Sequence, residues 1–173
     1  MKLTFFPYDF TYRVEEDKTY VYLFAKTPLN EKICVRHACE PYFYADPKHK
    51  EKIKELILVT KNETAKVTRI ENVTKDLLGK EQPFFKIYAN YPKAVPLLAK
   101  EIESWGTTCY ERDILFTHRY LRDHELLPFV ETSATGELEE HPLRPLRVPL
   151  YTLSAISQKK DTTTAWKILA VDI

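Results

Sequence analysis

Glycine is scarce in this sequence, with only three in 173 residues. A phosphate-binding loop needs several closely spaced glycines so that the backbone can approach the phosphates. Gly79, Gly106 and Gly136 stand far apart, so the chain has no such loop. Together with an aromatic content of 13%, the shortage of glycine predicts a rigid, packed, strand-containing protein rather than a disordered one.

Cysteine and long apolar runs are also rare. The three cysteines, Cys34, Cys39 and Cys109, form an odd number without the spacing of a disulfide framework, which favours a reducing compartment. No apolar run approaches the ~20 residues of a membrane span, and no signal-like segment begins the chain. We therefore expect a soluble, cytoplasmic protein without a membrane partner.

An excess of one charge sign is missing as well. The 26 basic residues oppose 25 acidic ones, and the net charge is +1. The chain therefore lacks the global basic field of a histone-like or tail-type nucleic-acid binder. Any contact with a nucleic acid would have to be local.

The N-terminal part of the sequence predicts strands. Residues 3–12 and 20–24 have extended patterns, and the polar residues 15–18 between them predict the turn of an edge hairpin. A third run over 32–44 contains Pro41, where a strand ladder is expected to bend or end.

Helical and extended patterns alternate from residue 47 onward. The predicted elements are a helix (48–59), two strands (64–73 and 83–89), a helix (91–105) with Gly106 at its C-terminal cap, a strand (107–113) and a short helix (115–123). Joined by one earlier strand, this order is a split βαβ unit of the ferredoxin or RNA-binding type. The fold class predicted is therefore α+β with mixed or antiparallel sheets.

A change of composition follows residue 130. Residues 131–161 hold Gly136, several prolines and an acidic cluster, a pattern typical of a linker that contains one strand over 146–156. The predicted organisation is an N-terminal template-binding domain over 1–130, an extended linker over 131–165 and the first strand of another domain over 166–173.

Two groups of residues suggest metal or acid–base chemistry. Cys34 to Cys39 contains the cysteine and histidine ligands that zinc prefers, but strand alternation would place the two thiols on opposite faces, which favours ordinary buried thiols. The remaining histidines have no serine or cysteine partner at recognisable spacing and are expected on helix surfaces or in solvent: His49, His118, His124 and His141.

The chain ends with the apolar run Ile168 to Val171, followed by Asp172. A carboxylate at the end of a buried strand is held rigidly, which suits divalent-metal binding in phosphodiester hydrolysis. One carboxylate cannot hold a metal pair, and by itself Asp172 is more typical of a turn or a cap.

Several stretches resemble one family in one order. The segment Tyr110 to Asp123, followed by Leu127-Pro128, is similar to the end of the N-terminal domain of archaeal family B DNA polymerases. Trp166 to Ile173 is similar to the start of that family's first 3′–5′ exonuclease motif. Shorter similarities lie at Pro41 to Ala45, Leu78 to Lys80 and Tyr91 to Pro96, so the resemblance covers nearly the whole chain.

The resemblance implies a piece of a multidomain polymerase, cut at the start of the exonuclease. Asp172 matches the first exonuclease carboxylate, whose glutamate partner would follow Ile173, so the metal site is incomplete and this fragment should neither hydrolyse nor polymerise. No cofactor is implied for the fragment, whereas the parent enzyme would use Mg²⁺. The implied partners are single-stranded template DNA and the remaining polymerase and exonuclease domains, for a monomeric, nucleoid-associated chain.

In archaeal members of the family, this domain senses uracil, and often hypoxanthine, in the template and stalls synthesis ahead of the active site. The resemblance assigns the base pocket to Tyr12, Pro41, Tyr42, Val95, Pro96, Ile114 and Phe116, and DNA contacts to Arg119, Lys100 and Lys93. An everted base would be sandwiched by apolar and aromatic walls, and Pro41 and Val95 would exclude the methyl group of thymine. We expect Val95→Gln to fill this pocket without changing the melting temperature.

One position departs from the family, and two other functions stay open. Where uracil sensors commonly carry an arginine one turn after the Val-Pro pair, this chain has Ala99, with Lys100 about 100° further round the helix. The alternatives are a structural domain that only braces the polymerase, and a general single-strand nucleic-acid module that stacks bases on Phe84, Phe85 and Tyr88. Because neighbouring strand residues face opposite ways, Phe84 and Phe85 cannot both contact one ligand.

Overall fold

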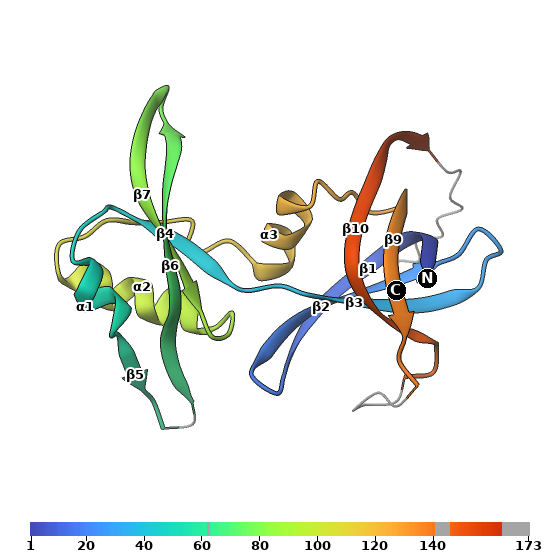
Figure 1. Cartoon of the computed structure of the whole chain (residues 1–173), viewed down its shortest axis with the longest axis horizontal. Helices are drawn as coiled ribbons and strands as arrows, with labels where there is room; N and C mark the ends of the chain where they lie inside the picture. The colour runs from blue at the N-terminus through green and yellow to red at the C-terminus, as the bar shows by residue number, and fades with distance from the viewer. Residues whose placement is uncertain (62, 141–145, 164–173) are drawn as a thin grey trace, which may run out of the picture. The chain divides into compact units, whose positions relative to one another are not determined.

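The computed structural model describes residues 1–61, 63–140 and 146–163. The chain divides into two compact units that alternate along the sequence. Unit 1 comprises Met1–Arg13, Tyr20–Ala38 and Thr117–Ile173, and unit 2 comprises Val14–Thr19 and Cys39–Phe116. Each unit is built on a sheet of its own (Figure 1).

Unit 1 is a closed five-stranded barrel with the strand order β1-β2-β3-β10-β9. Its strands are β1 (Lys2–Glu15), β2 (Lys18–Lys26), β3 (Lys32–Ala38), β9 (Val130–Leu138) and β10 (Leu150–Thr163). Strand β10 runs parallel to β3 and antiparallel to β9, whereas β2–β3 and β1–β9 are antiparallel. This arrangement is the topology of an OB-fold barrel.

Every second residue along the strands points into the barrel and fills its interior. Val21 and Leu23 of β2 are fully buried, as is Val35, the cross-strand partner of Leu23. At the other side of the barrel, Phe5 pairs with Thr132 and both are 0% exposed. Because the side-chain period of a strand is two, these residues fill one face and leave the intervening positions outside.

The predicted hairpin between β1 and β2 is confirmed, but it is not at an edge. Glu16 and Asp17 form its two-residue turn with φ of 47° and 66°, the backbone that a type I′ turn requires. Strand β1 also pairs with β9, and β2 also pairs with β3. Closure of the barrel therefore removes the edge that the local pattern predicted.

Unit 2 contains the predicted split βαβ unit. Its sheet has the order β5-β6-β7-β4-β8, made of β4 (Tyr42–Ala45), β5 (Ile57–Val59), β6 (Thr64–Leu77), β7 (Lys80–Ala89) and β8 (Cys109–Tyr110), with helices α1 (Lys50–Lys54) and α2 (Ala94–Ser104). Phe43 and Ile87 pair across β4 and β7 and pack against Leu98 of α2. The helices therefore cover one face of this sheet (Figure 1).

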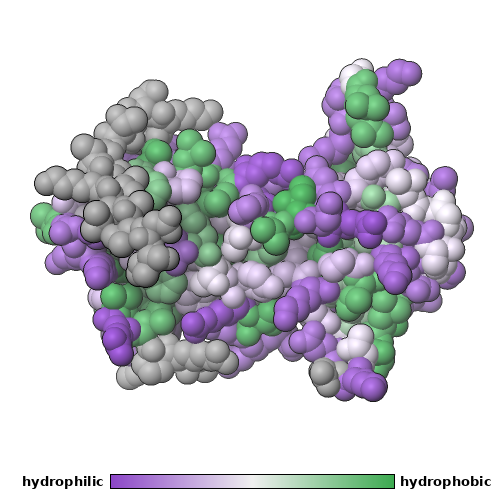
Figure 2. Space-filling model, turned by 180° about the vertical axis from the view of Figure 1, so that it is seen from behind, coloured by the Kyte–Doolittle hydropathy of each residue, from purple (hydrophilic) through white to green (hydrophobic). Residues whose placement is uncertain are grey.

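Strands β6 and β7 form a long hairpin beside the short β4. Leu77 pairs with Lys80 at its tip, and Leu78 and Gly79 turn the chain with φ of 54° and 80°. Leu78 is 96% exposed, and Figure 2 shows hydrophobic side chains towards the tip of this hairpin.

Two predicted elements of unit 2 are shorter than the sequence pattern indicates. The helix expected over 48–59 ends at Lys54, because Ile57–Val59 instead pairs with β6. The strand expected over 107–113 contains only Cys109–Tyr110, and Glu111 has a φ of 55°, which ends the extended backbone. By contrast, α2 and α3 (Phe116–Asp123) lie within the predicted helices.

The described part of 131–165 is not a linker, although the strand predicted within it over 146–156 overlaps β10. These residues form most of β9 and β10, which close the barrel. Gly136, which suggested a break, lies inside β9 opposite Leu153. Residues 141–145 and 164–173, including His141 and Asp172, lie outside the described residues. Among the described helices, none is long and apolar enough to cross a membrane.

Candidate nucleic-acid interface

The two faces of the unit 2 sheet carry different side chains. Phe43 and Phe85 point into the core under the helices, whereas Phe84 and Tyr88 belong to a second cluster with Tyr42 and Tyr44. In the register of β4 and β7, Tyr42 lies opposite Tyr88. The prediction that Phe84 and Phe85 face opposite ways is therefore confirmed.

Cationic side chains already lie over the rings of this second cluster. The Lys86 Nζ is 3.9 Å from the centroid of the Tyr42 ring, and the Arg69 Cζ is 3.7 Å from that of Tyr88. Tyr88 also donates a hydrogen bond of 2.9 Å to Glu71, which is paired with Arg69. The four rings of the cluster are only 5–7% exposed. A base would have to displace these contacts before it stacked here.

Sequence reasoning missed these cations, although alternation would have found them. Arg69 and Glu71 lie opposite Tyr88 and Lys86 in the β6–β7 register. Side chains on directly paired residues point to the same face of a sheet. Once the strand pairing is known, it places Arg69 and Glu71 on the same face of the sheet as the aromatic cluster.

Three segments that carry predicted pocket residues meet at one end of β4. The carbonyl oxygen of Pro41 accepts a 2.9 Å hydrogen bond from the N–H of Ala89, the last residue of β7. Helix α2 begins shortly afterwards at Ala94. Because β8 is antiparallel to β4, with Tyr44 opposite Tyr110, the chain leaves β8 towards this same end. Unit 2 thus collects Pro41, Tyr42, Val95 and Pro96 here, and Ile114 and Phe116 follow on the segment that leaves β8.

The pocket residues of unit 2 differ in exposure. Pro96 is exposed and Ile114 is half-buried, whereas the others are buried: Pro41, Tyr42, Val95 and Phe116. Val95 is 7% exposed and belongs to the core beneath the sheet. A glutamine at this position would bury an amide group, which costs free energy unless it is hydrogen-bonded. The expectation of an unchanged melting temperature for Val95→Gln therefore does not fit this packing.

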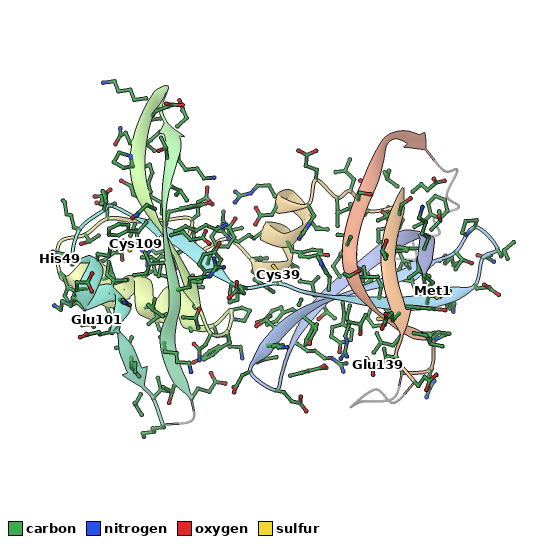
Figure 3. The ribbon with its side chains drawn as sticks, in the orientation of Figure 1. Met1, Cys39, His49, Glu101, Cys109 and Glu139 are labelled. Carbon is green, nitrogen blue, oxygen red and sulfur yellow. The ribbon has the colours of Figure 1, made fainter. Side chains whose placement is uncertain are left out.

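Ala99 lies on the face of α2 that packs against the sheet. It is fully buried, and its carbonyl oxygen lies 3.6 Å from the Sγ of Cys109, which Figure 3 labels between the sheet and α2. Because position 99 faces the sheet, the alanine there does not reduce the positive charge on the exposed side of α2. Lys93 and Lys100 of the same segment are exposed, as the predicted phosphate contacts require.

The remaining predicted residues belong to unit 1. Tyr12 lies near the end of β1 and is half-buried, whereas Arg119 of α3 is 2% exposed. A buried guanidinium must be bonded within the protein. Among the predicted phosphate ligands, Lys93 and Lys100 are therefore better placed than Arg119, whose contact with DNA stays a prediction.

His124 is not the solvent-facing residue that the sequence predicts. Its ring packs at 4.4 Å from that of Tyr120 and at 5.2 Å from that of His37. The Nδ1 of His37 lies 2.9 Å from the hydroxyl oxygen of Tyr120, at hydrogen-bond distance. Burial, aided by the nearby His124, lowers the pKa of His37 to about 4, and burial also lowers the pKa of His124.

This cluster predicts that acid destabilises unit 1. Because the pKa of His37 is depressed to about 4 in the folded chain, stability is complete above the unfolded-state pKa of about 6.5 and is lost as the pH falls towards 4. We expect a loss on the order of 2 kcal/mol from this residue. Urea denaturation at about pH 7 and pH 4.5 would measure it.

Two substitutions isolate the contribution of His37. In His37→Gln the acid-induced loss should be smaller than in the unsubstituted chain, whereas the exposed His49, changed to Asn, should leave it unaltered. Equal pH dependence in His37→Gln and the unsubstituted chain would contradict the assignment.

Comparisons with known proteins agree with this arrangement, although no protein-family model matches the chain. The DNA polymerase of Methanocaldococcus jannaschii is 41% identical over 130 residues, which are 69% of this chain and 8% of that protein. The DNA polymerase of Desulfurococcus sp. (strain Tok) is 34% identical over 125 residues, which are 69% of this chain and 16% of that protein. The structure of the family B DNA polymerase from the hyperthermophilic archaeon Pyrobaculum calidifontis matches 94% of this chain and 21% of its own, with a TM-score of 0.75 and 20% identity. This chain is similar in sequence to archaeal DNA polymerases, and its fold is similar to that of a family B DNA polymerase.

The homology confirms the polymerase relationship predicted from the sequence segments, and the shared fold confirms the α+β class. The match spans 8% and 16% of the two polymerase relatives by length, so these proteins are far longer than this chain. Within the described residues, no three His, Cys, Asp or Glu side chains group as metal ligands. Asp172 lies outside that part of the chain, and its role in a polymerase exonuclease stays a prediction.

Proposed function

We propose that this chain is the N-terminal domain of a family B DNA polymerase, where it binds single-stranded template and recognises deaminated bases, uracil first, ahead of the active site. The supporting observation is the meeting of Pro41, Tyr42 and the start of α2 at one end of β4. These are the segments that carry the base pocket in the polymerase family that the chain resembles.

The residue types at this end of β4 suit an everted base. Pro96 is exposed and Ile114 half-buried, so both offer apolar surface to a ligand. Val95 behind them is held by the core, and a wall that cannot move is what excludes the additional methyl group of thymine. Lys93 and Lys100 would bind phosphates, which gives position rather than sequence.

The partners in this proposal are the single-stranded template and the remaining polymerase and exonuclease domains. The relatives are DNA polymerases much longer than this chain, which supports the second of these partners. Catalysis and its Mg²⁺ would belong to those domains. Asp172 would supply one exonuclease carboxylate there.

A titration with fluorescent single strands tests base recognition. We expect a strand with one central deoxyuridine to bind about tenfold more tightly than the same strand with thymidine, since one methyl group in a tight pocket discriminates by that order. Fluorescence anisotropy across a salt series would measure both affinities. Equal affinities at every salt concentration would reject uracil sensing and leave general single-strand binding, and no binding would leave only a structural role.

A pair of variants on α2 tests the location of the pocket. Pro96→Gln should remove the preference for deoxyuridine without lowering the melting temperature, because Pro96 is exposed in the first turn of the helix. Leu97→Gln is the matched control, since Leu97 is 40% exposed and points about 100° away. A full preference retained in Pro96→Gln would place the base elsewhere.

A further inference from the structure

The outer side of the unit 1 barrel carries a regular set of aromatic and basic side chains that the base pocket does not use. Along β2, the inward residues Thr19, Val21, Leu23 and Ala25 are at most 5% exposed. The intervening, outward residues are Tyr20, Tyr22, Phe24 and Lys26. One strand thus presents three rings in a row, followed by a lysine.

Strand β3 extends this pattern with further cations. Arg36 lies opposite Tyr22, and Lys32 lies opposite Lys26. The β2–β3 outer face is therefore made of Tyr20, Tyr22, Phe24, Lys26, Lys32, Cys34 and Arg36. Neither strand contains an aspartate or glutamate, so the face is locally basic in a chain whose net charge is only +1.

The rings of this face are held in fixed orientations. The Arg36 Cζ is 4.7 Å from the centroid of the Tyr20 ring, and this guanidinium donates bonds of 2.9 Å to Thr152 and 2.8 Å to Glu139. Glu139 is labelled on the barrel in Figure 3. Arg13 lies over the ring of Tyr22, with its Cζ 5.3 Å from the centroid. Arg36 covers one face of the Tyr20 ring, so a base would have to stack on the other face or displace the guanidinium. A ring that is already held in place loses little conformational entropy when a ligand stacks on it.

The exposure of the rings indicates where a ligand would stack. Tyr22 is 3% exposed, and Leu146 and Val148 pack against its cluster. Tyr20 and Phe24, on either side of it, pack against the same cluster, but each is only half-buried. They are four residues apart, roughly 13 Å along the strand, so one extended strand would span both.

We propose that the β2–β3 outer face binds single-stranded DNA, with bases stacked on Tyr20 and Phe24 and phosphates held by Lys26 and Lys32. Stacking on side chains needs unpaired bases, which favours a single strand over a duplex. The same face of other OB-fold barrels binds oligonucleotides. The choice of DNA rests on the homology with DNA polymerases, and the site shares no residue with the proposed uracil pocket.

The test uses a fluorescent oligodeoxyadenylate of about 12 nucleotides, a length within the range that one OB-fold covers. Because it contains no deaminated base, its binding does not depend on uracil recognition. Tyr20→Leu, which keeps apolar volume but removes the ring, should weaken binding about tenfold. Lys26→Ala and Lys32→Ala should each weaken binding and reduce the salt slope of log K by about one.

A control variant separates this site from general effects. Lys54→Ala changes an exposed lysine of α1 in unit 2 and should leave binding unchanged. If Tyr20→Leu lowers the melting temperature, the two lysine substitutions, Lys26→Ala and Lys32→Ala, test the proposal instead.

Two results would overturn the proposal. One is an affinity and salt slope that none of the three substitutions on the β2–β3 outer face alters. The other is tighter binding of oligoriboadenylate of the same length, which would assign the face to RNA. Loss of the deoxyuridine preference alone leaves the proposal standing, because oligodeoxyadenylate does not report on the pocket.

Discussion

Replacing Phe43 by alanine is expected to lower the free energy of unfolding by about 4 kcal/mol. The ring is fully buried in the core of unit 2 and lies opposite Ile87 on the neighbouring strand. A close-packed interior cannot collapse far enough to fill the space of a phenyl ring, so a cavity cost adds to the lost burial. Urea denaturation followed by fluorescence would measure the loss, since Trp105 packs against the same core.

The control for this prediction removes the same atoms from an exposed position. Phe129 is 38% exposed, and Phe129→Ala should cost less than about 1 kcal/mol. Similar losses in the two variants would contradict the placement of Phe43 between the sheet and the helices.

Replacing Gly136 by alanine is expected to destabilise the barrel of unit 1 by roughly 2–3 kcal/mol. A Cβ at this position would lie 2.7 Å from the carbonyl oxygen of Thr152 and 3.2 Å from the Cα of Leu153. Both are backbone atoms of the paired strand β10, so β9 and β10 would have to move apart. Thermal denaturation would give the loss, and hydrogen exchange should show it first in the amides that join these two strands.

The neighbouring residue offers the matched control. Glu137 follows Gly136 in β9 and is exposed, so Glu137→Ala should change stability by less than about 0.5 kcal/mol. If Gly136→Ala proved as mild as Glu137→Ala, the strands would not approach as closely as the structure places them.

Both candidate binding surfaces combine basic side chains with aromatic or apolar ones, although the net charge of the chain is close to zero. The β2–β3 outer face contains Lys26 and Lys32 without a carboxylate on either strand. The end of β4 has Lys93 and Lys100 close to Pro96 in the sequence. Because its net charge is close to zero, the chain can contact a nucleic acid only through local groups of basic residues. Each unit offers such a group.

Elements with a complete local signal were predictable. Helix α2 follows from apolar spacing and from Gly106, whose φ of 77° is the left-handed conformation of a C-terminal cap. Pro41 separates β3 from β4 as expected, because proline cannot donate a ladder hydrogen bond. These signals lie within a few residues of the structure that they specify.

Elements that depend on distant partners were not predictable in the same way. Strand β10 pairs with β3, more than a hundred residues earlier, with Leu150 opposite Cys34. The sequence predicted a strand over 146–156 inside a linker, but not this pairing. Ile57–Val59 had helical spacing, but pairing with β6 made it a strand. Tertiary pairing overrides a weak local preference because it satisfies the backbone hydrogen bonds of a whole segment at once.

The same distinction between local pattern and tertiary packing applies to the site residues. The sequence by itself determined which residues alternate, and it separated Phe84 from Phe85 and set Tyr20 and Phe24 on one side of β2. Tertiary structure alone decided that Ala99 and Arg119 are buried while Pro96 is exposed. A period of two or 3.6 defines the faces of an element, whereas the burial of each face depends on what packs against it from elsewhere in the chain.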